Sequence, residues 1–191
     1  MPNWCDCELT ITGPVEELIR FREGVNRSAD KPYLEILASY YPLPQALEGI
    51  LTGCRRTEDG AWIDINSRVQ RNGKRIDLSV EERQTLARRY GASSANEWRC
   101  AFWGSKWGDC HTELHAGLGD AESPNSLVYV FDSAWNCPCP GFREVSKQFP
   151  LLTFSITYHE VRMGFAGSYV CRNGKELENS VIDTFDSNEE R

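Results

Sequence analysis

The chain has 191 residues, of which 40% are hydrophobic and 26% charged, a composition that fits one globular domain or one domain with a large insertion. Its net charge of −7 is unevenly spread, since residues 27–99 hold 12 Lys/Arg and 10 Asp/Glu and the other residues hold 9 and 18. That acidic remainder repels a phosphate backbone, so nucleic-acid binding by this part is disfavoured. No apolar run approaches the roughly 20 residues that cross a bilayer, and we expect no membrane partner.

The N-terminal sequence Met-Pro-Asn-Trp-Cys contains neither a basic stretch nor an apolar run, and it therefore predicts no secretory signal. We accordingly expect a cytoplasmic protein. In that compartment the eight cysteines are expected to be reduced thiols.

Regular structure begins with a predicted strand over residues 5–12, where apolar and polar residues alternate. Pro14 suits the first position of a helix, and apolar residues follow it at helical spacing. Residues 27–97 interrupt this rhythm with prolines and glycines, and we interpret them as an insertion or subdomain. Within the insertion we expect a strand over 61–69 and a helix that opens with the capping box at 79–82.

The alternating pattern returns after residue 98. Strands are predicted over residues 110–116, 127–135, 152–159 and 165–172, with a helix over 142–149. The order strand–helix–insertion–strand–strand–helix–strand, plus one further strand, predicts a ferredoxin-like, split β-α-β domain of the α+β class, formed by residues 1–26 and 98–177. Such a domain has an antiparallel sheet in the order 4-1-3-2 and two helices on one face. The polar residues 178–191 predict a flexible tail.

Several short motifs are similar to those of one family. The opening MPNWC, the aromatic FWGSKWG (102–108), FDSAW (131–135) and the QFP (148–150) that precedes a TYHE strand resemble the YubB-like proteins. The resemblance covers residues 1–25 and 98–172, and the chain departs from the family pattern at Cys7 and at Cys137-Pro-Cys139. It implies a ferredoxin-like domain in a protein carried by a phage or plasmid and located in the cytoplasm of the host cell. It brings no catalytic residues.

Two Cys-x-Cys pairs form the most specific candidate site. The first predicted strand runs antiparallel beside the strand that precedes Cys137, so Cys5 and Cys7 are expected to converge on Cys137 and Cys139. Four thiolates hold a tetrahedral Zn²⁺ in many proteins, although a spacing of two to four residues is commoner than this one. The alternatives are a disulfide and inert packing, the latter favoured because buried cysteine behaves as a small hydrophobic residue.

His111, Glu113 and His115 share one face of the strand over 110–116. Residues two apart on a strand lie about 7 Å apart, so a neighbouring pair is a candidate metal ligand set. His111 and His115 are about 13 Å apart, too far to share one ion. His159 belongs to the opposite edge of the predicted sheet, and a solvated polar face is the favoured interpretation.

The loop Trp103-Gly-Ser-Lys106-Trp107, together with Trp135, is a candidate anchor for a protein partner, because tryptophan is enriched in binding hot spots. The alternative is that these rings close the core beneath the insertion.

Nucleic-acid binding has two candidate surfaces. Stacking of RNA bases on the sheet is disfavoured, because its open face would carry the acidic residues Asp6, Glu8, Glu113 and Asp132. The basic candidates lie in the insertion and are Arg55, Arg56, Arg71, Lys74 and Arg75. These residues also fit a solvated surface.

Motifs typical of catalysis are missing: the sequence contains no G-x-S-x-G, Walker loop, G-x-G-x-x-G or H-E-x-x-H. We therefore expect a non-enzymatic accessory protein of a phage or plasmid that binds a host protein or immune complex. Anti-defence inhibition, in which the acidic domain covers the basic nucleic-acid channel of a CRISPR effector, is the more specific hypothesis. The alternatives are a zinc-stabilised or metal-dependent module, enzymes included, built on the paired cysteines, and a nucleic-acid binder acting through the insertion.

Overall fold

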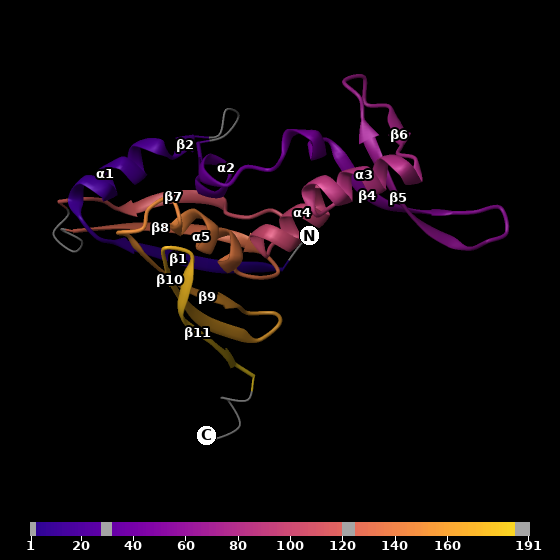
Figure 1. Ribbon diagram of the computed structural model, residues 1–191. Helices are drawn as coiled ribbons and strands as arrows, with labels where there is room; N and C mark the ends of the chain where they lie inside the picture. Colours follow the sequence, from indigo (N-terminus) through magenta and orange to yellow (C-terminus); the bar gives the residue numbers. More distant parts are fainter. Residues whose placement is uncertain (1–2, 28–31, 120–124, 186–191) are drawn as a thin grey trace. The chain divides into compact units, whose positions relative to one another are not determined.

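The computed structural model describes residues 3–27, 32–119 and 125–185, and it divides the chain into two compact units (Figure 1). The main unit comprises Met1–Pro42 and Trp103–Arg191, and the inserted unit comprises Leu43–Phe102. These limits differ from those of the predicted insertion, 27–97, because the segment that follows the first helix pairs with strands of the main unit. Within the described ranges, no helix is long and apolar enough to cross a membrane.

One large antiparallel sheet organises the main unit. In chain order its elements are β1 (Trp4–Thr12), α1 (Val15–Gly24), β2 (Asn26–Arg27), β3 (Leu34–Glu35), α2 (Ile36–Tyr40), β7 (Cys110–Ala116), β8 (Ser126–Ala134), α5 (Cys139–Ser146), β9 (Thr153–Glu160), β10 (Phe165–Arg172) and β11 (Lys175–Asp183). The strands lie in the order β11-β10-β9-β1-β8-β7-β3-β2. The central strand β1 is therefore hydrogen-bonded to β9 on one side and to β8 on the other.

Alternation along β1 determines which side of the sheet is covered. Cys5, Cys7, Leu9 and Ile11 are buried, and the side chains between them face the opposite side. The buried residues of β8 and β9 lie opposite these four in register. The polar half of the alternating pattern therefore forms an open face of the sheet.

Phe21 of α1 is the centre of the core on the covered side. Its side chain is fully buried, and its ring centroid lies 5.0–6.1 Å from those of Tyr40, Tyr129, Phe149 and Phe154. Offset and edge-to-face ring contacts of this kind add to the hydrophobic gain from burial. The apolar spacing that predicted the first helix therefore reflects its packing on the sheet.

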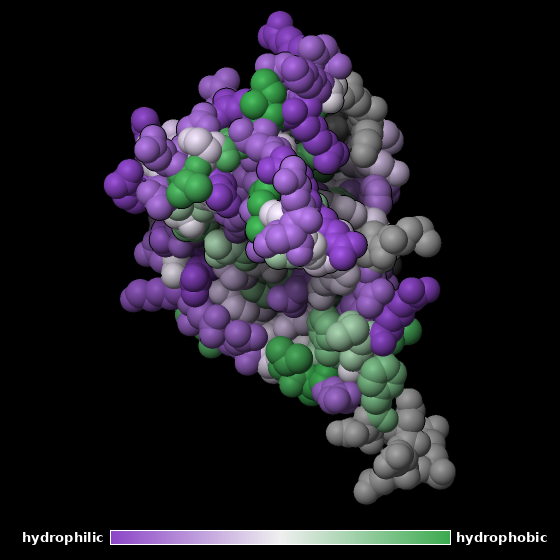
Figure 2. Space-filling model, turned by 90° about the vertical axis from the view of Figure 1, so that its right-hand side faces the viewer, coloured by the Kyte–Doolittle hydropathy of each residue, from purple (hydrophilic) through white to green (hydrophobic). Residues whose placement is uncertain are grey.

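β11 is one edge of the sheet, and all of its residues are exposed. The predicted flexible tail, 178–191, begins too early, because residues 178–183 pair with β10; residues 186–191 lie outside the described part of the chain. Leu177, Val181 and Ile182 of β11 are 60–62% exposed, and Figure 2 shows hydrophobic residues on the lower part of the surface. A polar edge strand with both faces in solvent lacks the alternation by which strands are recognised.

The inserted unit contains a three-stranded antiparallel sheet in the order β4-β5-β6. Its elements are a 3-10 turn (Gln45–Leu47), β4 (Ile50–Arg56), β5 (Trp62–Val69), β6 (Arg75–Asp77), α3 (Val80–Tyr90) and α4 (Ala95–Trp98), followed at its boundary by a π-helical turn (Arg99–Trp103). The predicted capping box is confirmed, because the Ser79 hydroxyl accepts from the Glu82 amide and the Glu82 carboxylate accepts from the Ser79 amide. Gly91, at φ 78°, ends α3 in the left-handed conformation that favours glycine.

Candidate binding site on the open sheet face

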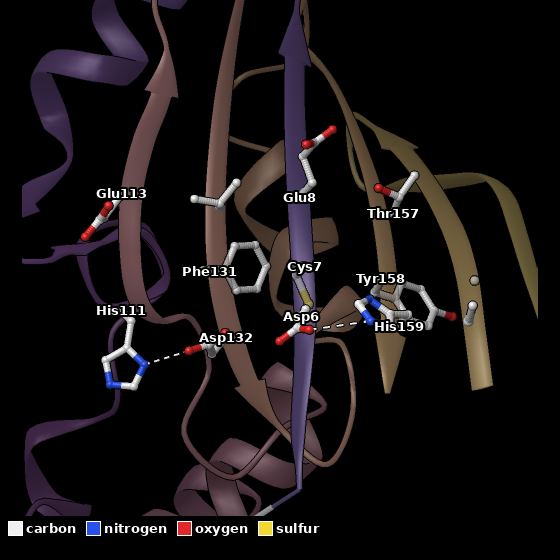
Figure 3. Close-up of a pocket in the computed structure, with 13 residues that line it drawn as sticks. Asp6, Cys7, Glu8, His111, Glu113, Phe131, Asp132, Thr157, Tyr158 and His159 are labelled. Atoms are coloured by element: carbon white, nitrogen blue, oxygen red, sulfur yellow. Dashed lines mark hydrogen bonds and ion pairs between the residues drawn. The ribbon is translucent and has the colours of Figure 1, made fainter. Parts of the chain in front are cut away.

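A groove of about 570 Å³ crosses the open face of the main sheet from β7 to β10 (Figure 3). Its lining includes the carboxylates of Asp6, Glu8, Glu113 and Asp132. These are the four acidic residues that alternation placed on the open face. None of the described residues that line the groove is Lys or Arg, so the groove is an anionic surface at the centre of the sheet.

Two histidine–aspartate pairs span this groove (Figure 3). His111 Nδ1 lies 2.8 Å from Asp132 Oδ2, and His159 Nε2 lies 3.5 Å from Asp6 Oδ2. Asp6 and Asp132 are directly opposite each other in the register of β1 and β8. Like charges in that arrangement destabilise a sheet, and a cation bound between them relieves the repulsion.

His111 reaches the groove through an irregular stretch of backbone. Its φ is 54°, in the left-handed region that residues with a side chain seldom adopt, and the register of β7 on β8 shifts between Cys110 and Glu113. The structure brings His111 and Glu113 into the groove, whereas His115 is not among the described residues that line it. A bulge beside a binding surface is a common way to redirect a side chain.

The two histidines are poorly placed to act together on one bond. They belong to β7 and β9, which three strand spacings separate by about 14 Å, whereas an acid and a base must both reach the same reacting group. Among the described residues, no three His, Cys, Asp or Glu side chains are grouped so that they could hold a metal ion. What the groove offers is charge attraction and hydrogen-bond acceptance along the sheet.

The four cysteines of the two Cys-x-Cys pairs converge on the covered side of the sheet. The sulfurs of Cys5 and Cys7 are 3.9 Å apart, and the thiol of Cys7 also contacts that of Cys137. Cys137 in turn contacts Cys139 at the start of α5. The thiols therefore form a row, from Cys5 to Cys139, and none of these four cysteines is in a disulfide.

The thiols of this row differ in the direction in which their pKa values are shifted. Hydrogen bonds with Cys137 and Cys5 lower the pKa of Cys7 to about 6, against the opposing effect of burial. The bond that Cys5 makes to Cys7, together with burial, raises the pKa of Cys5. Burial raises that of Cys137. The structure thus confirms that the thiols meet, while zinc binding by them stays a prediction.

The tryptophans of the candidate anchor divide into two groups. Trp103 is buried, and its indole N–H donates to the Tyr41 carbonyl at 2.9 Å, so its ring is not presented to a partner. Trp107 and Trp135 are 39% and 44% exposed, with ring centroids 6.0 Å apart. The ammonium of Lys106 lies 5.9 Å and 5.2 Å from their ring centroids.

The basic candidates for nucleic acid do not form one cluster in the inserted unit. Arg55 pairs with Asp77, and Arg56 donates to the Gly60 carbonyl. In the sheet register Arg56 is opposite Trp62, at the start of β5, and Arg75 is opposite Val69, at its end. Arg71 and Lys74 belong to the turn between β5 and β6, so the length of β5 separates them from Arg55 and Arg56.

A second pocket, of about 350 Å³, shares His111 with the groove. Trp4, Tyr33 and Trp107 line it together with Glu35. Trp107 was predicted from the sequence, whereas Trp4 and Tyr33 were not, because their approach depends on the pairing of β3 with β7, for which the sequence carries no local pattern.

Comparison with known proteins supports the fold. Residues 102–191 match the family model described as the ferredoxin-like domain in Api92-like protein. The chain is also similar to the crystal structure of a protein Api92 from Yersinia pseudotuberculosis, with a TM-score of 0.52 and 12% sequence identity, over 95% of this chain and 98% of that chain. No curated protein matches the chain in sequence. At this identity the likeness shows the fold alone, and the chain is accordingly a mixed α+β protein with antiparallel sheets and a ferredoxin-like domain.

Proposed function

We propose that the protein is a non-enzymatic binding protein whose anionic groove holds a basic segment of a protein partner. The observation that supports this most directly is the set of four carboxylates in one groove, with no Lys or Arg among its described lining residues. The main unit as a whole holds 11 Lys/Arg and 20 Asp/Glu, whereas the inserted unit holds 10 and 8. A field of one sign around the groove steers a basic partner toward it, most strongly at low salt.

The proposal needs a sheet with one face left free. We infer a split β-α-β arrangement, in which β1-α1-β7 and β8-α5-β9 fold together with both helices on the face opposite the groove. The strand order β9-β1-β8-β7 supports this inference. The complete burial of Phe21 in α1 and Phe142 in α5 supports it as well.

A peptide titration tests the proposal. A fluorescently labelled hexa-arginine peptide is titrated with the protein at about 20 mM and about 150 mM salt, since screening of exposed charges differs strongly between these conditions. We expect binding that weakens with salt and that falls at least about tenfold in the double variant Asp6→Asn/Asp132→Asn.

The matched control is Glu16→Gln/Glu23→Gln, which removes the same charge from exposed positions of α1. We expect this control to bind within about twofold of the wild type. Equal losses in the two double variants would show that net charge, and not the groove, attracts the peptide, and the proposal would then be rejected. Circular dichroism of each variant establishes that the fold is retained.

The narrower form of the proposal concerns anti-defence. The partner would be the basic nucleic-acid channel of a host immune complex, and the support for it is the acidic main unit and the resemblance to proteins of phages and plasmids. A plasmid-interference assay in a host with an active CRISPR system should show protection by the wild type that is lost in Asp6→Asn/Asp132→Asn. Absence of protection across common defence systems would exclude this partner and leave the peptide-binding proposal intact.

A further inference from the structure

The pocket beside the groove has walls made largely of aromatic rings. The ring centroids of Trp4 and Trp107 are 5.7 Å apart, those of Trp4 and His111 are 5.4 Å apart, and those of Tyr33 and His111 are 5.0 Å apart. These contacts join four rings into one continuous aromatic wall around about 350 Å³. Rings arranged in this way present electron-rich faces, which attract cations.

The charge at the pocket is negative. Glu35 and Asp109 both line it, and no Lys or Arg is among the described lining residues. The Asp109 oxygens already accept from the amides of Ile36 and Leu37, at 2.7 Å and 3.0 Å. The carboxylate of Glu35 is therefore the group that offers charge to a ligand.

A cation of the chain itself lies near one ring of the pocket, that of Trp107. Lys106 places its ammonium 5.9 Å from the ring centroid of Trp107 and 5.2 Å from that of Trp135, yet it is not among the residues that line the pocket. Trp107 thus contributes both to an intramolecular cation–π contact and to the wall of the pocket.

His111 links the pocket to the groove, because it lines both. Its left-handed backbone places the imidazole against Trp4 and Tyr33 while Nδ1 contacts Asp132 in the groove. Unusual backbone at a non-glycine residue is costly and persists where the surrounding structure fixes it. Because His111 lines both, a basic segment held in the groove would lie directly beside the aromatic pocket.

We propose that this aromatic pocket receives an arginine side chain of the partner, with the guanidinium stacked on the rings of Trp4 and Trp107 and hydrogen-bonded to Glu35. The inference rests on the proposed function and names the residue type that anchors the partner. Arginine fits better than lysine because its planar guanidinium stacks on aromatic faces and forms two parallel hydrogen bonds with one carboxylate. An ammonium offers a point charge and makes neither arrangement.

The experiment compares hexa-arginine with hexa-lysine, two peptides of equal charge, on the full-length protein. We expect the wild type to bind hexa-arginine about tenfold more tightly. The variants Trp107→Leu and Glu35→Gln should each reduce that preference to about twofold or less, while salt-dependent binding of both peptides through the groove persists. Trp62→Leu, in the inserted unit at a tryptophan that is 70% exposed, is the matched control and should keep the full preference.

Each outcome decides between the two proposals. If the wild type binds both peptides equally, or if the pocket variants keep the preference, the arginine pocket is refuted and the groove proposal stands. If neither peptide binds the wild type, both proposals fail. Because Glu35→Gln removes no ring, it tests the pocket even where a tryptophan variant fails to fold.

Discussion

Asp109 supports the wall of the aromatic pocket, and its titration is open to measurement. Its oxygens accept hydrogen bonds from the amides of Ile36 and Leu37 and from the Thr112 hydroxyl, which hold the start of α2 against β7. Although the residue as a whole is only half-buried, its carboxylate is enclosed. This burial raises the pKa of Asp109 from 3.8 to about 6, with the hydrogen bonds acting in the opposite direction.

The raised pKa has a defined effect on stability. The folded protein holds the Asp109 proton more tightly than the unfolded chain, so the contribution is complete below the unfolded pKa of 3.8 and is lost as the pH rises through about 6. Integrating the linkage relation between about pH 4.5 and about pH 7.5 gives a loss of about 2 kcal/mol from this one group. Asp109→Asn retains the shape and removes the titration.

Urea unfolding of the wild type and of Asp109→Asn at the two pH values isolates this term, because every other titrating group is common to both proteins. We expect the free energy of unfolding of the wild type, relative to the variant, to be about 2 kcal/mol higher at pH 4.5 than at pH 7.5. Parallel pH profiles would refute the reasoning. A difference of the opposite sign would show that the hydrogen bonds outweigh burial and lower the pKa.

Three further predictions test the core, the thiols and a helix cap. Phe21→Ala should lower the free energy of unfolding by about 3–5 kcal/mol in urea denaturation, because the ring is fully buried among four aromatic side chains; a loss below about 1 kcal/mol would contradict this packing. Inert packing of the thiols from Cys5 to Cys139, three of which are buried, predicts no stoichiometric zinc in elemental analysis of purified protein. About one zinc ion per chain, lost in Cys137→Ser, would overturn this and establish the zinc hypothesis. Ser79→Ala should cost α3 about 1 kcal/mol, seen as faster amide exchange in its first turn, whereas unchanged exchange would remove the capping box as a source of stability.

The regular part of the fold could be predicted from the sequence, because a strand or helix buried on one side has apolar residues at a regular spacing. The strands predicted over 110–116 and 165–172 have those bounds in the structure. β2 and β3 are two residues each, too short for any period to show, and their pairing is a tertiary event. β11 is exposed along its whole length, so its sequence shows no alternation of buried apolar and exposed polar residues.

Part of the candidate site could also be predicted from the sequence. The alternation of apolar and polar residues in the sequence predicts that Asp6 and Asp132 lie on the open face, since a strand with one buried side must turn its other residues outward. The aromatic pocket could not be predicted. The rings of Trp4 and Tyr33 each contact the ring of His111, and no residue pattern indicates the left-handed backbone of His111. Sites made by a bulge between distant segments leave little trace in local sequence.

The opposed carboxylates of Asp6 and Asp132 lead to a prediction that separates binding from folding. Facing like charges on neighbouring strands destabilise the folded state by about 0.2–1 kcal/mol. The contact of Asp6 with His159, at 3.5 Å, offsets little of this repulsion. Asp6→Asn should therefore leave the free energy of unfolding unchanged or raise it by up to about 1 kcal/mol, while affinity for hexa-arginine falls. A residue that serves the fold behaves in the opposite way, so a loss of stability in urea denaturation with unchanged peptide affinity would assign Asp6 to the sheet and not to the partner.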